Sequence, residues 1–310
     1  MTETAGGARI RAAFETARRE GRTALVPYVV AGYPDAETSY AAALACIDGG
    51  ADLLEVGLPY SDPLADGATL QRASAAALRA GATFDGSIEL VRRIARSRPR
   101  VPLVPMCYAN QVIGGGDGAA AARRLAEAGA SGIIVADLTP DVGAEFEAAA
   151  ADARLAVVYL VAPTTAPERR RMIAERSGGF LYCVSLVGVT GARSSLPADV
   201  ARLVRDVRAA SPVPVAVGFG VSRPAHVRAL ARAGADGVIV ASALVDALGA
   251  DGRDIEALAR LVRSLRDATG ETGRRPDDGP RPRARRAAGV EHQPTGLPAP
   301  MELFDVSRSG

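Results

Sequence analysis

The chain has 310 residues, 48% of them apolar, which is enough for one large domain or two ordinary domains with substantial cores. Its 37 basic and 35 acidic residues leave a formal charge of +2, so no overall field favours nucleic acid or an anionic membrane as a partner. Every basic residue is arginine. The absence of lysine excludes Schiff-base chemistry, covalent attachment of pyridoxal phosphate and a Walker-type phosphate loop within this chain.

The cysteines and histidines indicate neither a disulfide framework nor a metal site. Cys46, Cys107 and Cys183 lie far apart within apolar stretches, which is typical of buried, reduced thiols. His226 and His292 form no metal-binding spacing with them, so we expect no metal. The N-terminal residues predict an amphipathic helix instead of a signal peptide, and no apolar run is as long as a membrane span. We therefore expect a cytoplasmic protein.

One recurring unit organises the chain: a helix that ends in a glycine-containing turn and continues into an apolar strand. It occurs at residues 43–57, 123–137 and 228–242. In each copy, alanine and leucine recur at helical spacing, and a glycine follows where a helix C-terminus needs a left-handed residue. Further apolar runs bounded by glycine, proline or aspartate predict strands at residues 24–32, 101–110, 155–163, 179–186 and 213–220.

Eight predicted strands alternating with helices over roughly 250 residues favour a (β/α)8 TIM barrel, because buried parallel strands are continuously apolar. An open doubly wound sheet is the alternative. It is disfavoured because the residues after the first strand read AGYPDAE instead of a Gly-x-Gly-x-x-Gly turn. We expect a capping helix at about residues 8–20, below the barrel, and an inserted helix at residues 68–81.

The composition changes near residue 271, so we assign residues 1–270 to the barrel and residues 271–310 to a disordered tail. The tail holds six of the 20 prolines and shows no helical or strand period. Its arginine-rich stretch allows weak contact with anions or nucleic acid, but a solvated tail is the preferred interpretation. We expect no nucleic-acid or membrane partner.

The candidate catalytic residues are two carboxylates near the second strand. Active sites of (β/α)8 barrels form at the C-terminal ends of the strands and in the loops that follow. Glu55 is unusual because it lies in DLLEVGLP, a strand otherwise built for burial, and desolvation would make it a proton donor near neutral pH. A hydrogen-bonded structural glutamate is the alternative. Asp66, in the following loop, is placed to share its cavity, although turn chemistry alone also explains an aspartate there.

A second set of candidates follows the seventh and eighth strands, where barrels of this kind commonly bind phosphate. Gly218 and Gly220 allow close approach of the backbone to a ligand, and Ser242 is placed to cap a short helix. Residues 184–197 are rich in glycine, serine and threonine and have the length of a lid that excludes water. A mobile connection is the alternative for this segment.

Together these motifs resemble the tryptophan synthase alpha chain family. The resemblance covers about residues 8–268, and its most specific motif is EVGLPYSDPLADG. It implies a TIM-barrel lyase of tryptophan biosynthesis that cleaves indole-3-glycerol phosphate to indole and glyceraldehyde 3-phosphate, without a metal ion or a Schiff base. The matching segments are, in family order, PYVVAGYPD (27–35), ADLLEVGLPYSDPLADG (51–67), MCYAN (106–110), VADL (135–138), LYCVS and GVTGAR (within 181–193), GFGVS (218–222) and VIVASALV (238–245).

The resemblance also implies roles for individual residues. Glu55 would move protons to the indole ring carbon and from the glycerol hydroxyl, and Asp66 would hold the indole N–H. The side chains implied to line the substrate pocket are Tyr28, Tyr108, Tyr182, Phe219 and, in the closing loop, Thr190. Those implied to surround the phosphate are Gly191, Gly220, Ala241 and Ser242. The resemblance implies no cofactor in this chain and, as partner in an alpha2beta2 assembly, a beta chain that carries pyridoxal phosphate.

Some residues depart from the family pattern. Ala241 stands where the family often has glycine, and Leu186 and Val187 replace more polar residues, which leaves the lid and the partner contacts open. Two other interpretations remain: a stand-alone indole-3-glycerol phosphate lyase of specialised metabolism, and a catalytically silent barrel that acts as a regulatory subunit. The intact pair of Glu55 and Asp66 disfavours the silent barrel.

Overall fold

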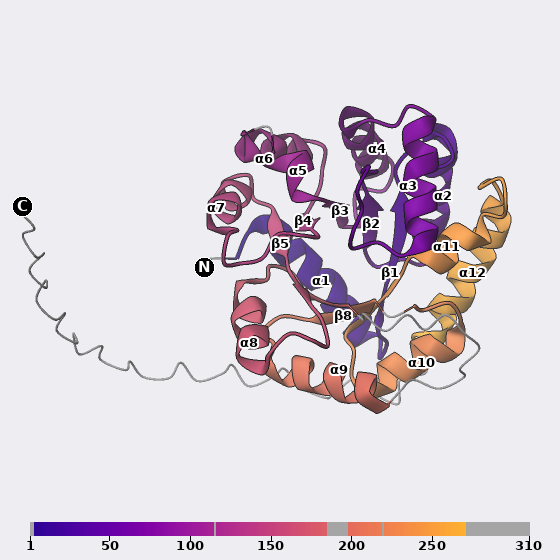
Figure 1. The fold of residues 1–310 in the computed structure, drawn as a ribbon. Helices are drawn as coiled ribbons and strands as arrows, with labels where there is room; N and C mark the ends of the chain where they lie inside the picture. The colour runs from indigo at the N-terminus through magenta and orange to yellow at the C-terminus, as the bar shows by residue number, and fades with distance from the viewer. Residues whose placement is uncertain (1–2, 115, 185–197, 219, 271–310) are drawn as a thin grey trace, which may run out of the picture. The chain divides into compact units, whose positions relative to one another are not determined.

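The computed structural model describes residues 3–114, 116–184, 198–218 and 220–270 (Figure 1). The predicted tail and residues 185–197 of the predicted lid lie outside this part of the chain, so the division at residue 270 stays a prediction. The residues named above that lie outside it are Leu186, Val187, Thr190, Gly191, Phe219 and His292.

In the described part of the chain, nine strands form one parallel sheet. They are β1 (Ala24–Val30), β2 (Leu54–Gly57), β3 (Leu103–Cys107), β4 (Gly132–Val135), β5 (Ala156–Val158), β6 (Leu160–Val161), β7 (Leu181–Val184), β8 (Val215–Gly218) and β9 (Gly237–Val240). The sheet order is β5-β4-β3-β2-β1-β9-β8-β7-β6. Only Tyr159 separates the two end strands in the chain, so the sheet closes on itself. This confirms the TIM barrel, and the doubly wound alternative is wrong.

The predicted strand at residues 155–163 is divided in two at Tyr159, and this division has a local cause. The backbone N–H of Tyr159 donates to the Ser177 hydroxyl at 3.0 Å instead of to a neighbouring strand. The Tyr159 carbonyl still accepts the N–H of Tyr182 at 3.0 Å, so the barrel wall continues across the interruption. The chain therefore forms the eight expected barrel strands, with the fifth split into β5 and β6.

The helices of the described residues surround this barrel. They are α1 (Ala5–Arg19), α2 (Ala36–Asp48), α3 (Ala68–Arg79), α4 (Phe84–Ser97), α5 (Ala109–Val112), α6 (Gly118–Glu127), α7 (Ala144–Asp152), α8 (Pro167–Arg176), α9 (Ala198–Ala210), α10 (Pro224–Ala233), α11 (Ser242–Ala247) and α12 (Ile255–Ala268). The expected capping helix is α1, which begins earlier than predicted because the Thr4 side chain caps it at Gly7 N. The expected inserted helix is α3. No described helix is long and apolar enough to cross a membrane.

The three glycines of the recurring unit have the left-handed backbone that the sequence predicts. Gly50, Gly129 and Gly234 have φ angles of +103°, +97° and +100°. L-residues with a side chain rarely adopt this conformation, so glycine allows each helix to turn abruptly into the next strand. These turns return the chain to the N-terminal end of the barrel.

Two apolar layers stabilise the fold. The inner layer fills the barrel, and Ile10 and Phe14 of α1 join it from the N-terminal end of the strands. The outer layer lies between the strands and the surrounding helices and includes Cys46, Cys107 and Cys183, which are buried free thiols as predicted. Helix α1 therefore closes one end of the barrel and leaves the other end for the functional loops.

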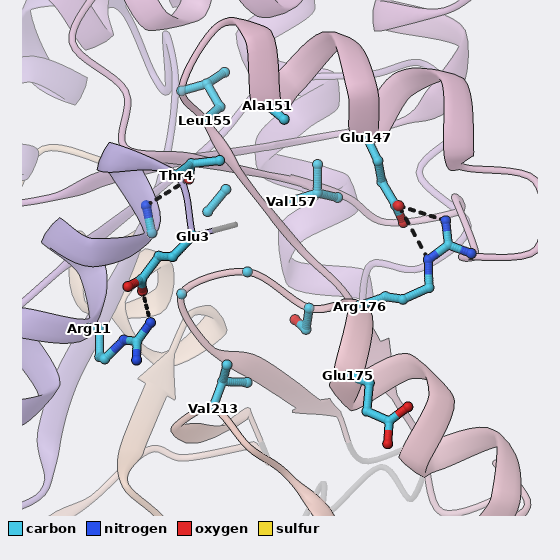
Figure 2. A pocket seen from close by; sticks show the side chains of 15 residues that line it. Glu3, Thr4, Arg11, Glu147, Ala151, Leu155, Val157, Glu175, Arg176 and Val213 are labelled. Carbon is cyan, nitrogen blue, oxygen red and sulfur yellow. Dashed lines mark hydrogen bonds and ion pairs between the residues drawn. The ribbon is translucent and has the colours of Figure 1, made fainter. Parts of the chain in front are cut away.

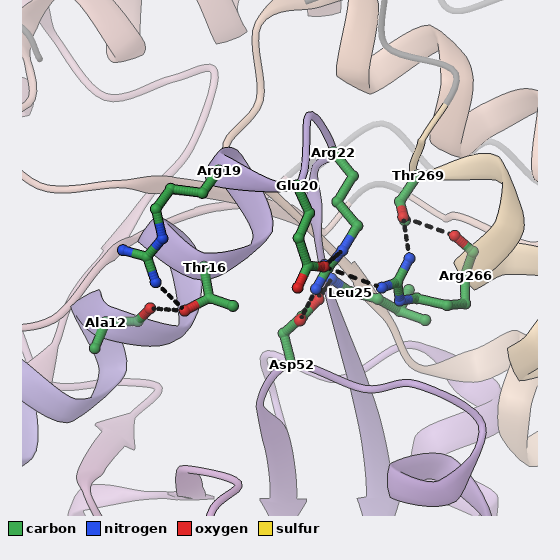
Figure 3. Close-up of polar contacts among 9 residues, drawn as sticks. All are labelled: Ala12, Thr16, Arg19, Glu20, Arg22, Leu25, Asp52, Arg266 and Thr269. Carbon is green, nitrogen blue, oxygen red and sulfur yellow. Dashed lines mark hydrogen bonds and ion pairs between the residues drawn. The ribbon is translucent and has the colours of Figure 1, made fainter. Parts of the chain in front are cut away.

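A buried ion pair joins the N-terminal ends of β1 and β2 (Figure 3). Arg22, only 7% exposed, donates to both carboxylate oxygens of Asp52 at 2.6 and 2.7 Å. Asp52 also accepts the backbone N–H of Leu25 at 2.8 Å. Glu20 accepts from Arg22 at 2.6 Å and lies 3.6 Å from Arg266 of α12. The network thus connects the end of α1, the first two strands and the last described helix.

Asp52→Asn should destabilise the protein by about 3 kcal/mol, because it leaves the Arg22 guanidinium buried without its main counter-charge. Urea unfolding measures the loss. The matched control is Asp48→Asn, since Asp48 also receives two hydrogen bonds from one arginine, Arg98, but on the exposed surface. We expect the control to lose less than about 1 kcal/mol. Equal losses in the two variants would contradict a special role for the buried pair.

Candidate active site

Glu55 is a buried carboxyl group without a hydrogen-bond partner among the described residues. It lies on β2, beside Tyr28 of β1 and Val104 of β3 in the strand register. Its side chain is 1% exposed, and neither carboxyl oxygen has a partner. The lack of partners argues against the alternative of a hydrogen-bonded structural glutamate. Burial and, to a smaller degree, the charge of Asp66 raise the pKa of Glu55 to about 8, so the group carries a proton at neutral pH.

Asp66 lies in the loop between β2 and α3 and is only partly buried. Burial raises the pKa of Asp66 to about 6, while a hydrogen bond from Tyr108 opposes the shift. Asp66 is therefore mostly ionised at neutral pH. The two carboxyl groups interact, yet one holds its proton and the other does not, which is the pattern of an acid paired with an acceptor.

Two tyrosines reach the carboxylates from the barrel wall because glycines make room for them. The Tyr28 hydroxyl occupies the space of a side chain at Gly57, where a Cβ atom would lie 1.7 Å from the hydroxyl oxygen. A Cβ atom at Gly218 would lie 2.7 Å from the Tyr182 hydroxyl oxygen. Burial and then the charges of Asp66 and Glu55 raise the pKa of both tyrosines well above its ordinary value.

Tyr108 holds the loop that carries Asp66. Its hydroxyl accepts the backbone N–H of Ala65 at 3.1 Å, and its ring stacks on Tyr60 with the centroids 5.1 Å apart. Gln111 accepts the Tyr108 N–H at 3.1 Å and donates to the carbonyl of Pro59 at 3.0 Å. Tyr60 and Gln111 were not among the residues predicted from the sequence. The three-residue spacing from Tyr108 to Gln111, which fits the N-terminus of a helix, is the signal that could have indicated the second.

The predicted phosphate-binding residues lie at the same end of the barrel as Asp66. Gly220 follows β8 and Ala241 follows β9, and these neighbouring parallel strands pair Gly218 with Ile239. Gly220 has a φ of +52°. The expected cap at Ser242 is wrong: Ala241 is the N-cap of α11, Ser242 is its first residue, and no side chain caps the helix. The turn from β9 into α11 ends one residue earlier than the sequence indicated.

A cavity of about 170 Å³ lies at the opposite end of the barrel (Figure 2). It is lined by the start of α1 and by residues that precede or begin β5, β7 and β8. Glu3 pairs with Arg11 on one side of it, and Glu147 accepts from Arg176 at 2.6 Å on the other. These charged side chains pair with one another. The cavity lies at the N-terminal end of the strands, so it is separate from the site of Glu55. The described residues include no group of three or more side chains suited to a metal ion.

Comparison with known proteins identifies the family. The family model for the tryptophan synthase alpha chain matches residues 14–270. The chain belongs to the tryptophan synthase alpha chain family. It is 44% identical over 259 residues to the tryptophan synthase alpha chain of Methanothermobacter thermautotrophicus, which covers 84% of this chain and 95% of the relative. The corresponding protein of Deinococcus radiodurans is 45% identical over 256 residues, covering 82% and 93%.

Solved structures of tryptophan synthase have the same fold. A chain of the Mycobacterium tuberculosis enzyme matches with a TM-score of 0.78 and 41% identity, covering 84% of this chain and 98% of that one. The tryptophan synthase A-subunit of Pyrococcus furiosus matches with a TM-score of 0.74 and 35% identity, covering 80% and 99%. The barrel of this alpha chain family member is therefore matched over nearly the full length of these relatives.

Glu55→Gln should stabilise the protein at alkaline pH. The folded protein holds the Glu55 proton up to about pH 8, whereas the unfolded chain releases it near 4.5. Because the folded state binds more protons between these values, stability falls as pH rises through them. Glutamine removes this loss, so the variant should gain on the order of 1.4 kcal/mol per pH unit across that window.

Urea unfolding of both proteins at pH 4.5, 6 and 8 measures this gain, which should be absent at pH 4.5 and largest at pH 8. Glu15→Gln, on the exposed face of α1, is the control and should show no pH-dependent difference. A Glu55→Gln effect of the same size at all three pH values would contradict the shifted pKa.

Proposed function

We propose that this chain cleaves indole-3-glycerol phosphate to indole and glyceraldehyde 3-phosphate, with Glu55 transferring protons and Asp66 holding the indole N–H. The reaction is the lyase step of tryptophan biosynthesis that characterises the alpha chain family. The observation that carries the assignment of residues is the buried, unpartnered carboxyl of Glu55, whose pKa is raised to about 8, beside the ionised Asp66.

The two carboxyl groups divide the chemistry of the retro-aldol step. The protonated Glu55 gives its proton to the indole ring carbon that carries the glycerol chain, and positive charge develops on the ring nitrogen. The carboxylate of Asp66 accepts the hydrogen bond of that N–H and stabilises the charge. The Glu55 carboxylate then takes the proton of the glycerol hydroxyl as the carbon–carbon bond breaks, which forms the aldehyde and restores the acid.

The remaining predicted residues form the rest of the substrate site. Tyr28, Tyr108 and Tyr182 supply aromatic surface around the carboxylates, which suits a flat indole ring. The family motif assigns Phe219 and Thr190 to the same pocket. The phosphate would lie against the backbone at Gly220, Ala241 and Ser242, together with Gly191. Ala241 has a φ of −123°, which is outside the left-handed region that favours glycine, so the change from glycine is compatible with a backbone contact to phosphate.

We also assign a beta chain as partner, in an alpha2beta2 assembly in which that chain carries pyridoxal phosphate and this lysine-free chain carries no cofactor. Leu64 and Val142 support a protein partner because they are large apolar side chains that are 93% and 75% exposed. They lie in the loops after β2 and β4, on the rim that holds Asp66. A cytoplasmic location belongs to the same proposal, since the three buried thiols suit a reducing compartment.

Indole release from indole-3-glycerol phosphate tests the reaction. Glu55→Gln and Asp66→Asn should each slow turnover by at least ~100-fold, because each removes a group that acts on the reacting ring. Asp62→Asn is the matched control, since Asp62 is an exposed aspartate of the same loop. We expect it to retain the parent rate. Full activity of Glu55→Gln would contradict the assignment and favour a silent regulatory barrel.

Leu64→Ser tests the partner surface. The variant should bind the beta chain roughly tenfold more weakly, which corresponds to about 1.4 kcal/mol, while its indole release without a partner stays at the parent rate. Titration of the beta chain against the rate of indole release measures both quantities. A parent chain that releases indole rapidly alone and gains nothing from the beta chain would indicate a stand-alone lyase instead.

A further inference from the structure

The proposed reaction requires Glu55 to be ionised for part of each cycle in a place with no donor beside it. The folded protein tolerates Glu55 because the carboxyl group is neutral. After Glu55 gives up its proton, the same buried position must hold a negative charge. A buried carboxylate without a hydrogen-bond donor is strongly disfavoured. Neither oxygen of Glu55 has a partner among the described residues, so a donor must turn toward it during the reaction.

Tyr28 lies closest in the strand register and points into the same space. It pairs with Glu55 across β1 and β2, and its hydroxyl lies over Gly57. Residues two apart on a strand project from the same face, so Gly57 and Glu55 both face the barrel interior. The Tyr28 hydroxyl is therefore held beside the strand face that carries Glu55. The absence of a side chain at Gly57 keeps this position open.

The Tyr28 hydroxyl is also within electrostatic reach of every other titratable group of the described site. The groups whose charge acts on it are, in order, Asp66, Glu55, Tyr108 and Tyr182. Its hydroxyl makes no hydrogen bond to another described residue. Tyr108, by contrast, is already engaged with Ala65 and Asp66. Tyr28 is thus a buried, uncommitted donor beside the carboxyl group that becomes charged during the reaction.

We propose that the Tyr28 hydroxyl is a positioning donor that turns to Glu55 and donates to it once that group has given up its proton. Rotation about a single C–O bond redirects the donor, and the ring stays in place over Gly57. Tyr28 keeps its proton throughout. The glutamate proton goes to the indole carbon and returns from the glycerol hydroxyl, so the tyrosine neither gains nor loses a proton. This role rests on the proposed function only for the point in the reaction cycle at which Glu55 loses its proton.

Tyr28→Phe tests the proposal in the free protein before any activity is measured. Phenylalanine keeps the ring in its buried place and removes only the donor. Loss of the donor penalises the ionised form of Glu55, so the pKa of Glu55 should rise by about half to one pH unit. Carboxyl ¹³C NMR titration measures this shift without substrate, so the outcome does not depend on the assigned reaction.

The activity of the same variant separates positioning from substrate binding. We expect kcat to fall about tenfold with KM within twofold of the parent, and the limb of the pH–rate profile that Glu55 sets to move to higher pH. Tyr40→Phe is the matched control: it removes a surface hydroxyl that bonds to Ser97 at 2.6 Å and should change none of these quantities. Unchanged carboxyl titrations, or a raised KM with an unshifted pH profile, would overturn the proposal and make Tyr28 an ordinary contact of the substrate.

Discussion

The structure depends on the cost of placing Glu55 in the interior of a barrel without a hydrogen-bond partner. Removing a carboxylate from water is so unfavourable that the group retains its proton, and that retained proton is what the proposed reaction uses. The inner and outer apolar layers supply the folding free energy that makes such a position tolerable. If Glu55 acts as proposed, the fold loses stability at a residue that the reaction needs, and the rest of the barrel offsets the loss.

The surroundings of Glu55 are organised by two kinds of contact. Glycines at positions 57 and 218 make room for tyrosine hydroxyls from neighbouring strands, which bring polar groups to the carboxyl without bonding to it in the described structure. The loop that carries Asp66 is held by Tyr108, which accepts from its backbone and donates to the aspartate. Because Asp66 is less buried, its pKa stays below that of Glu55, so at neutral pH Asp66 is mostly ionised and Glu55 is protonated.

The two ends of the barrel differ in whether their polar groups are paired. At the N-terminal end, α1 closes the barrel and the buried Arg22 is paired with Asp52. At the C-terminal end, the Glu55 carboxyl group has no partner among the described residues and remains available to a ligand. This division is typical of (β/α)8 enzymes, in which the loops after the strands change function while the opposite end maintains stability.

The sequence by itself determined the architecture and the main catalytic candidate. Burial leaves a local pattern in the sequence, seen here as helical spacing, glycine turns and continuous apolar runs, and this pattern indicated eight barrel strands. A carboxylate within an apolar run is recognisable from the sequence without any structure. Tertiary structure alone decided which side chains meet. Tyr28 lies over Gly57, Arg22 bonds to Asp52, and Tyr159 divides the fifth strand through Ser177. These contacts join residues far apart in the chain, and their partners are set by strand register and barrel closure, which leave no periodic signal in the sequence.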